Sequence, residues 1–153
     1  MQNETDRTEG LARALADAGL IQFGRFAQPD GGVWPVAVHL DWLPSYPDVL
    51  RQAARALAPL MDGLGVDRVL AGPGALPVGV ALSFETGVPL VYTVSEMRSA
   101  ADAFAIEGAY DVGHPTVLLS NLLLDAAQAE SLTALAGRVG LEVRAMLAVL
   151  DLG

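Results

Sequence analysis

The chain has 153 residues, of which 52% are hydrophobic and 18% are charged, and its formal net charge is −9. This length and composition indicate one globular domain and exclude a disordered chain. The nine cationic residues are all Arg and are scattered, which excludes the basic stripe of a nucleic-acid-binding protein. Without Cys, a signal peptide or an apolar run of roughly 20 residues, we expect a cytoplasmic protein that binds no membrane.

The first forty residues predict a helix followed by a hairpin. Residues 5–21 carry an apolar stripe that includes Leu11 and Leu15, and Gly19 is a typical helix stop. Residues 21–27 alternate as a strand does, with one face formed by Ile21, Phe23 and Arg25. After a Gly-rich turn, residues 33–41 form the second arm. Pro35 suits a sheet edge or a bulge there.

The rest of the chain alternates between helical and extended patterns. Residues 45–64 predict an amphipathic helix with Ser45 as its N-cap, and Pro59 should bend or end it. The following strands are expected at 67–72, 89–94, 115–120 and 141–152, and helices at 75–87 and 125–140, with a small hairpin near 104–110. This order predicts an α/β fold with a mainly parallel, doubly wound sheet.

In such folds, ligands bind where strands end. The loop Gly72, Pro73, Gly74 and Ala75 precedes a helix and could present N–H groups to an anion, although glycines in such turns are often purely steric. Ser120 and Asn121 end another strand, and Asp125 suits a helix N-cap. The sequence of the segment 95–107 is equally consistent with a mobile lid and with a simple surface loop.

The sequence shows no recognisable set of catalytic residues. His39 and His114 have no ligand-like spacing to an acid, and no Ser lies in a nucleophile-elbow context. His114 precedes a proline at a strand entry, which is typical of a turn residue. The acids Asp41, Asp48, Glu85 and Glu96 would form an acid–base pair only if the fold brought them together.

Three segments in this order resemble the type I phosphoribosyltransferases, most closely the orotate phosphoribosyltransferases. They are "GLIQFGRF" (19–26), "AGPGALPVGVALSFETGVPLVY" (71–92) and "IEG" (106–108). The second resembles the family's pyrophosphate-loop segment. The resemblance covers nearly the whole chain and implies a single domain over 1–153, with a helix-plus-hairpin hood at 1–43 and a core at 44–153. It also implies a homodimer.

The chain departs from the family at its defining motif, D-D-x-x-T-T-G-G. In the family, the two acids meet the ribose hydroxyls and the metal, and the Thr/Gly turn binds the 5-phosphate. Here the acids align with Ser120 and Asn121, the threonines with Leu124 and Asp125, and the glycines with Ala126 and Ala127. A carboxylate inside a phosphate cradle would repel the ligand. Of the family's loop cations, the resemblance retains only Arg98.

These observations give three hypotheses. The first is a catalytically inactive phosphoribosyltransferase-fold protein with a ligand-binding role, or a regulatory role beside an enzyme paralogue. It has no catalytic or metal-binding residue and no cofactor. Its candidate cleft comprises Gly72, Pro73, Gly74, Ala75, Ser120, Asn121 and Asp125, with Arg98 as a loop cation. The second is a divergent orotate phosphoribosyltransferase of pyrimidine biosynthesis, which makes orotidylate with Mg²⁺. The third is a pure interaction protein whose cleft is filled by its own side chains.

Overall fold

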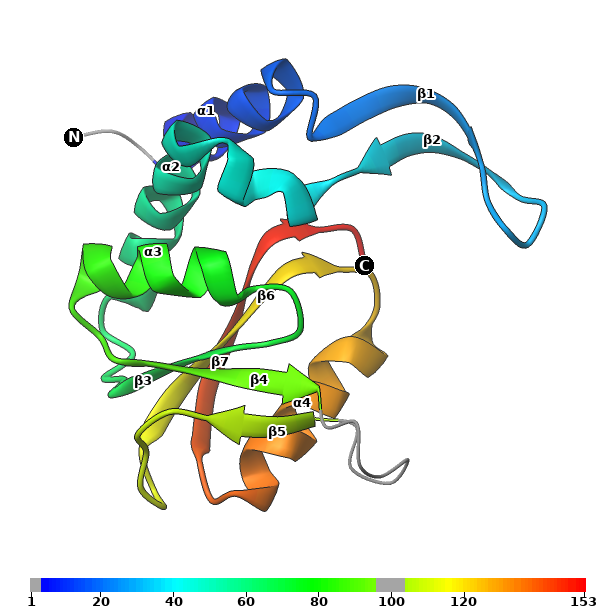
Figure 1. Ribbon diagram of the computed structural model, residues 1–153. Coiled ribbons are helices and arrows are strands. Elements are labelled where there is room, and N and C mark those ends of the chain that lie inside the picture. Colours follow the sequence, from blue (N-terminus) through cyan, green and yellow to red (C-terminus); the bar gives the residue numbers. More distant parts are fainter. Residues whose placement is uncertain (1–3, 96–103) are drawn as a thin grey trace.

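A computed structural model describes residues 4–95 and 104–153. A five-stranded sheet with the order β5-β4-β3-β6-β7 forms the body of the molecule, and all its neighbouring strands are parallel except the β4–β5 pair. Figure 1 shows this sheet below a separate two-stranded hairpin. The sheet strands are β3 (Arg68–Ala71), β4 (Leu90–Ser95), β5 (Phe104–Glu107), β6 (Pro115–Leu123) and β7 (Glu142–Asp151). The predicted mainly parallel α/β sheet is confirmed.

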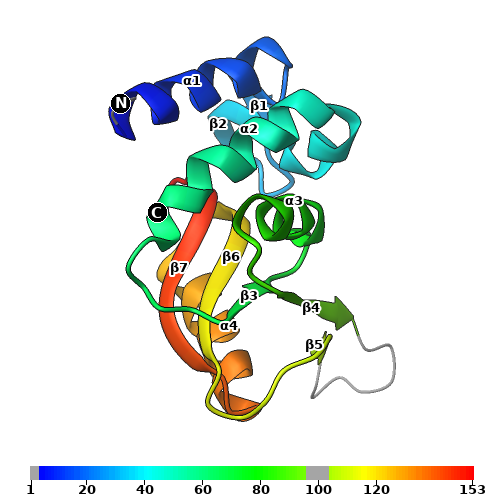
Figure 2. The ribbon, with the colours of Figure 1, turned by 90° about the vertical axis from the view of Figure 1, so that its left-hand side faces the viewer.

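Helices cover both faces of the sheet, as Figure 2 shows. On one side α2 (Pro47–Leu57) and α3 (Leu76–Thr86) pack against the sheet, with α1 (Glu4–Asp17) lying against α2, and α4 (Ala126–Arg138) covers the other side. Successive residues of a strand point to opposite faces. Val117 and Leu119 of β6 therefore pack in the cluster with α2 and α3, whereas Leu118 packs with Leu132 and Leu135 of α4. All three β6 side chains are completely buried, which explains the continuous apolar run in the sequence.

The hairpin of β1 (Ile21–Ala27) and β2 (Val33–Val38) extends away from the sheet (Figure 1). Its pairing shifts between Phe23 and Phe26, so that two β1 residues lie opposite Pro35. This bulge confirms the place expected for a proline, which cannot donate a ladder hydrogen bond. The regular alternation predicted for β1 is wrong beyond Phe23, because the extra residue puts Phe26 rather than Arg25 on the Phe23 face. Phe23 itself is 80% exposed.

Local signals set most helix ends. Gly19 has a left-handed φ of 73°, and the N–H of Leu20 donates to the Leu15 carbonyl at 2.9 Å, which closes α1. At Pro59 the α-helix gives way to a short 3-10 turn, η2 (Ala58–Met61), as predicted. The capping role predicted for Ser45 is wrong. That residue ends another 3-10 turn, η1 (Leu40–Ser45), and Tyr46 precedes α2 without a side-chain cap.

Two extended segments differ from expectation. Strand β6 continues to Leu123, three residues beyond the predicted end, so Ser120 and Asn121 lie within the strand. The small hairpin expected near 104–110 is absent from the described residues, where Phe104–Glu107 instead pairs antiparallel with β4. Residues 96–103 of the predicted connection lie outside the described residues. No helix in the described ranges is long and apolar enough to cross a bilayer. The division into hood and core stays a prediction.

Candidate functional site

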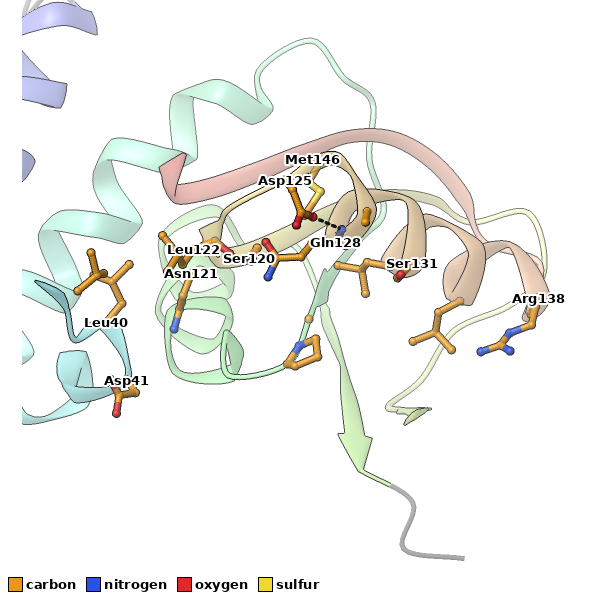
Figure 3. Close-up of a pocket in the computed structure, with 16 residues that line it drawn as sticks. Leu40, Asp41, Ser120, Asn121, Leu122, Asp125, Gln128, Ser131, Arg138 and Met146 are labelled. Carbon is orange, nitrogen blue, oxygen red and sulfur yellow. Dashed lines mark hydrogen bonds between the residues drawn. The ribbon is translucent and has the colours of Figure 1, made fainter. Parts of the chain in front are cut away.

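A cleft of about 810 Å³ opens at the carboxyl ends of β3 and β6, between the 3-10 turn η1 and helix α4. In Figure 3, Ser120 and Asn121 lie in its middle, Leu40 and Asp41 at one end and Arg138 at the other. Its remaining lining comes from the hairpin end, the loop after β3, helix α4 and strand β7: Val38, Gly72, Pro73, Leu122, Asp125, Ala127, Gln128, Ser131, Leu132, Leu135 and Met146. This is the place where α/β sheets hold their ligands.

Helix α4 begins with a reciprocal cap made by its own side chains. The Asp125 carboxylate accepts a hydrogen bond from the Gln128 N–H at 3.1 Å, which is the dashed line in Figure 3. The Gln128 side-chain carbonyl in turn accepts from the Leu124 N–H at 2.7 Å. The first bond satisfies a donor that a helix start leaves open, and the second resembles a capping box that returns to the residue before the N-cap. The capping role predicted for Asp125 is confirmed, and a negative charge thus occupies the helix N-terminus.

Ser120 and Asn121 are engaged inside the protein. The Ser120 hydroxyl donates to the Leu122 carbonyl at 2.9 Å, and the Asn121 amide nitrogen donates to the Gly74 carbonyl at 2.8 Å. The second bond joins residues 47 positions apart and ties the end of β6 to the loop after β3. The Asn121 side-chain carbonyl is buried and has no partner among the described residues. This leaves one buried acceptor beside the cleft.

The loop between β3 and α3 has few free amide donors. The Gly72 N–H donates to the Leu119 carbonyl at 2.8 Å, and the Ala75 N–H donates to the Gly72 carbonyl at 3.0 Å. Pro73 has no N–H. Within the stretch 72–75, the Gly74 N–H is the one amide without a hydrogen bond to another described residue. A single amide is a poor cradle for a pyrophosphate, which multiple convergent N–H groups would bind.

The structure brings together most of the predicted cleft residues. Gly72, Pro73, Ser120, Asn121 and Asp125 line the cleft. Gly74 contributes its carbonyl to Asn121, while Ala75 is fully buried in the core and does not line the cleft. Arg98 lies outside the described residues. His114 accepts the Asp111 N–H at 2.9 Å in the turn before β6, as expected for a turn residue.

Sequence reasoning did not place the hood and helix residues in this cleft. Leu40 and Asp41 reach it from η1, whose position depends on how the hood packs on the core. Along α4, Gln128, Ser131 and Leu135 recur at intervals of three and four residues, the spacing of one helix face. That spacing can be seen in the sequence, but a helix face that lines a cleft and one that packs in the core have the same spacing.

The cleft residues do not suit a divalent cation. Among the described residues, no group of three or more His, Cys, Asp or Glu side chains could hold a metal ion. By the resemblance, the positions that hold two acids in the family are Ser120 and Asn121 here, and their hydroxyl and amide already donate to backbone carbonyls. Mg²⁺ prefers carboxylates together with substrate phosphates. The side chains at these two positions therefore do not fit the magnesium ion that the family's acids would hold.

No protein-family model matches the chain. Similar proteins are nevertheless found by sequence. The orotate phosphoribosyltransferase of Natronomonas pharaonis is 31% identical over 143 residues, which cover 92% of this chain and 80% of that protein. The one from Halobacterium salinarum is 30% identical over 146 residues, covering 94% and 82%. The chain also matches 24% of a longer "Bifunctional enzyme PyrF/PyrE" of a Nostoc species, at 28% identity over 115 residues.

Solved structures agree with the sequence comparison. The Leishmania donovani UMP synthase superposes with a TM-score of 0.76 at 34% identity, over 93% of this chain and 30% of that chain. The orotate phosphoribosyltransferase of Aeropyrum pernix, at 17% identity, also superposes with a TM-score of 0.76, over 93% of this chain and 93% of that chain. The type I phosphoribosyltransferase fold inferred from the sequence is thus confirmed. On these similarities, the chain belongs to the orotate phosphoribosyltransferase family.

Proposed function

We propose that this protein binds a ligand in the cleft without transferring phosphoribose to it. The observation that carries the proposal is the reciprocal cap between Asp125 and Gln128 at the start of α4. By the family resemblance, a 5-phosphate would have to sit at this helix start. The Asp125 carboxylate competes for the same N–H groups, and its charge repels a phosphate.

Two further features support the same proposal. The loop 72–75 retains one unengaged N–H for a pyrophosphate, because its other amides bond within the protein. The pair Ser120 and Asn121 supplies no charge for a ribose or a metal ion. Phosphoribosyl transfer develops charge on ribose and pyrophosphate, and an enzyme stabilises such charge with preorganised cations, metal ions and N–H groups. Among the described residues of the cleft, these groups are missing at several of the positions where the resemblance expects them.

A second candidate function is orotate phosphoribosyltransferase activity itself. The names of the relatives favour it, since the proteins of Natronomonas pharaonis and Halobacterium salinarum, each 30% or more identical to most of this chain, are orotate phosphoribosyltransferases. The comparisons contain nothing that favours inactivity. In this alternative, the enzyme would work in pyrimidine biosynthesis, and Mg²⁺ would have to be held mainly by the substrate.

A transferase assay separates the two candidates. The purified chain is incubated with orotate, Mg²⁺ and phosphoribosyl pyrophosphate, and orotidylate is measured by chromatography. We expect no product above the rate without protein. Product formation that falls when Asn121 is replaced by Ala would establish the enzyme instead, because a contaminating enzyme would not respond to that substitution.

The homodimer and the cytoplasmic location expected from the sequence also belong to this proposal, as does a regulatory role beside an enzyme paralogue. Light scattering coupled to size-exclusion chromatography measures the mass directly. A mass near twice 15.9 kDa is expected. A monomer at micromolar concentration would remove the dimer from the proposal and leave the ligand-binding role untouched.

A further inference from the structure

We infer that the cleft accepts a small organic amine with an apolar body, and that it discriminates against anions of the same shape. This inference rests on the proposed function and names the class of ligand for the same site. It is drawn from the shape of the cleft, the charges that line it and the state of its hydrogen-bonding groups.

The shape and wall of the cleft suit an apolar body. A volume of about 810 Å³ lies in the usual range for small-molecule sites. Half of the lining consists of apolar side chains from six elements or loops: Val38, Leu40, Pro73, Leu122, Ala127, Leu132, Leu135 and Met146. Leu132, Leu135 and Met146 belong to the cluster that packs α4 on the sheet, so the cleft reaches down to the core.

The charges of the cleft favour a cation. Asp41 and Asp125 line it, and neither takes part in an ion pair among the described residues. Among the described residues of the lining, Arg138 is the one cation, and it already has an interaction of its own. The chain as a whole has a net charge of −9, which adds a negative field around the cleft. These charges therefore attract an amine and repel an anion.

The hydrogen-bonding groups in the middle of the cleft favour a ligand that donates. The Ser120 hydroxyl and the Asn121 amide nitrogen already donate hydrogen bonds to backbone carbonyls. The acceptors that remain are the two carboxylates and the buried Asn121 carbonyl, which lacks a partner among the described residues. The Gln128 side-chain amide and the Ser131 hydroxyl of the same lining can still donate, but neither carries a charge. A buried acceptor without a partner costs free energy, and a small adjustment of the Asn121 side chain would let a ligand N–H supply one.

The test uses three probes that share one indole body and differ in charge at pH 7. They are tryptamine, which is cationic, tryptophol, which is neutral, and indole-3-acetate, which is anionic. Calorimetric titration should rank their affinities in that order. An indole-3-acetate affinity equal to or above that of tryptamine would overturn the inference, and so would the absence of binding by all three probes.

Variants locate the preference in the cleft. Asp125→Asn keeps an N-cap side chain and removes the charge, and it should weaken tryptamine binding about fivefold while leaving tryptophol unchanged. Asp41→Asn should act in the same direction. Asp62→Asn, at an exposed acid outside this cleft, is the matched control and should change neither probe. An unchanged preference in both cleft variants would place the selectivity elsewhere and overturn the inference.

The two proposals fail separately. Orotidylate formation in the transferase assay contradicts the proposed function, whatever the indole probes do. A preference for indole-3-acetate in a chain that makes no orotidylate contradicts only the choice of an amine ligand.

Discussion

The chemistry of this cleft depends strongly on one side chain, that of Asp125. It accepts the Gln128 N–H at 3.1 Å and brings a negative charge to the helix start, where the family resemblance places a phosphate. The same carboxylate thus stabilises the helix and opposes the anion. The two effects are separable, because Asn also caps a helix but carries no charge.

At this residue, Asp125→Ala should lower the free energy of unfolding by about 1 kcal/mol, since the N-cap bond is lost. Asp125→Asn should lower it by a few tenths at most. Urea denaturation followed by circular dichroism measures both values. Equal losses in the two variants would mean that the cap bond contributes nothing and that only the charge matters.

Single residues also show what the sequence could predict about local structure. Gly19, Pro59 and Asp125 act through their own backbone or side-chain chemistry, and the structure places all three as expected. The prediction for Ser45 is wrong because a residue with a high capping propensity can instead belong to a preceding turn, here η1. Propensity predicts that a helix begins nearby, but tertiary packing decides the residue.

At the scale of elements, the strands of the sheet were predictable because their signal is strong. The run 116–119 is fully buried on both faces, and only a central parallel strand needs that pattern. The walls of the cleft were less predictable. Leu40 and Asp41 come from the hood and Leu135 from α4, and no local pattern says that these segments face the same space.

Close packing of α3 on the sheet provides a prediction at this scale. A Cβ at Gly79 would lie 2.8 Å from a Leu90 methyl and 3.0 Å from the Ala71 Cβ. Gly79→Ala should therefore destabilise the fold by ~1 kcal/mol, because the strain of overpacking exceeds the gain in helix propensity. Thermal and urea unfolding would measure the change.

Gly137 in α4 is the matched control. A Cβ there meets nothing within 4 Å, so Gly137→Ala should stabilise the protein by up to ~1 kcal/mol through helix propensity alone. If both substitutions stabilised the chain, α3 would not pack on β3 and β4 as tightly as described.

At the scale of the whole molecule, charge is the dominant feature. Eighteen acidic residues face nine arginines, and the ion pairs that link described residues are few and exposed, such as Arg51–Asp48 at 2.8 Å. Exposed pairs contribute little, and the excess negative charge repels itself in the compact state.

Added salt should therefore raise the midpoint of thermal unfolding between about 0.05 and 0.5 M NaCl, because screening weakens this repulsion. Differential scanning calorimetry at fixed pH gives the midpoint. Potassium chloride as a second salt controls for a specific effect of sodium. A midpoint that falls with both salts would show that attractive ion pairs outweigh the net repulsion.

On this proposal, the cleft keeps the family's scaffold but does not accept phosphoribosyl pyrophosphate. A titration of the ¹⁵N-labelled protein with phosphoribosyl pyrophosphate and Mg²⁺ tests this, followed through the amide signals of residues 124–128 and of Gly72, Gly74 and Ala75. We predict no saturable shifts at these amides up to millimolar ligand. Saturable shifts at the start of α4 would show that the phosphate displaces the Asp125 cap, and they would contradict the account.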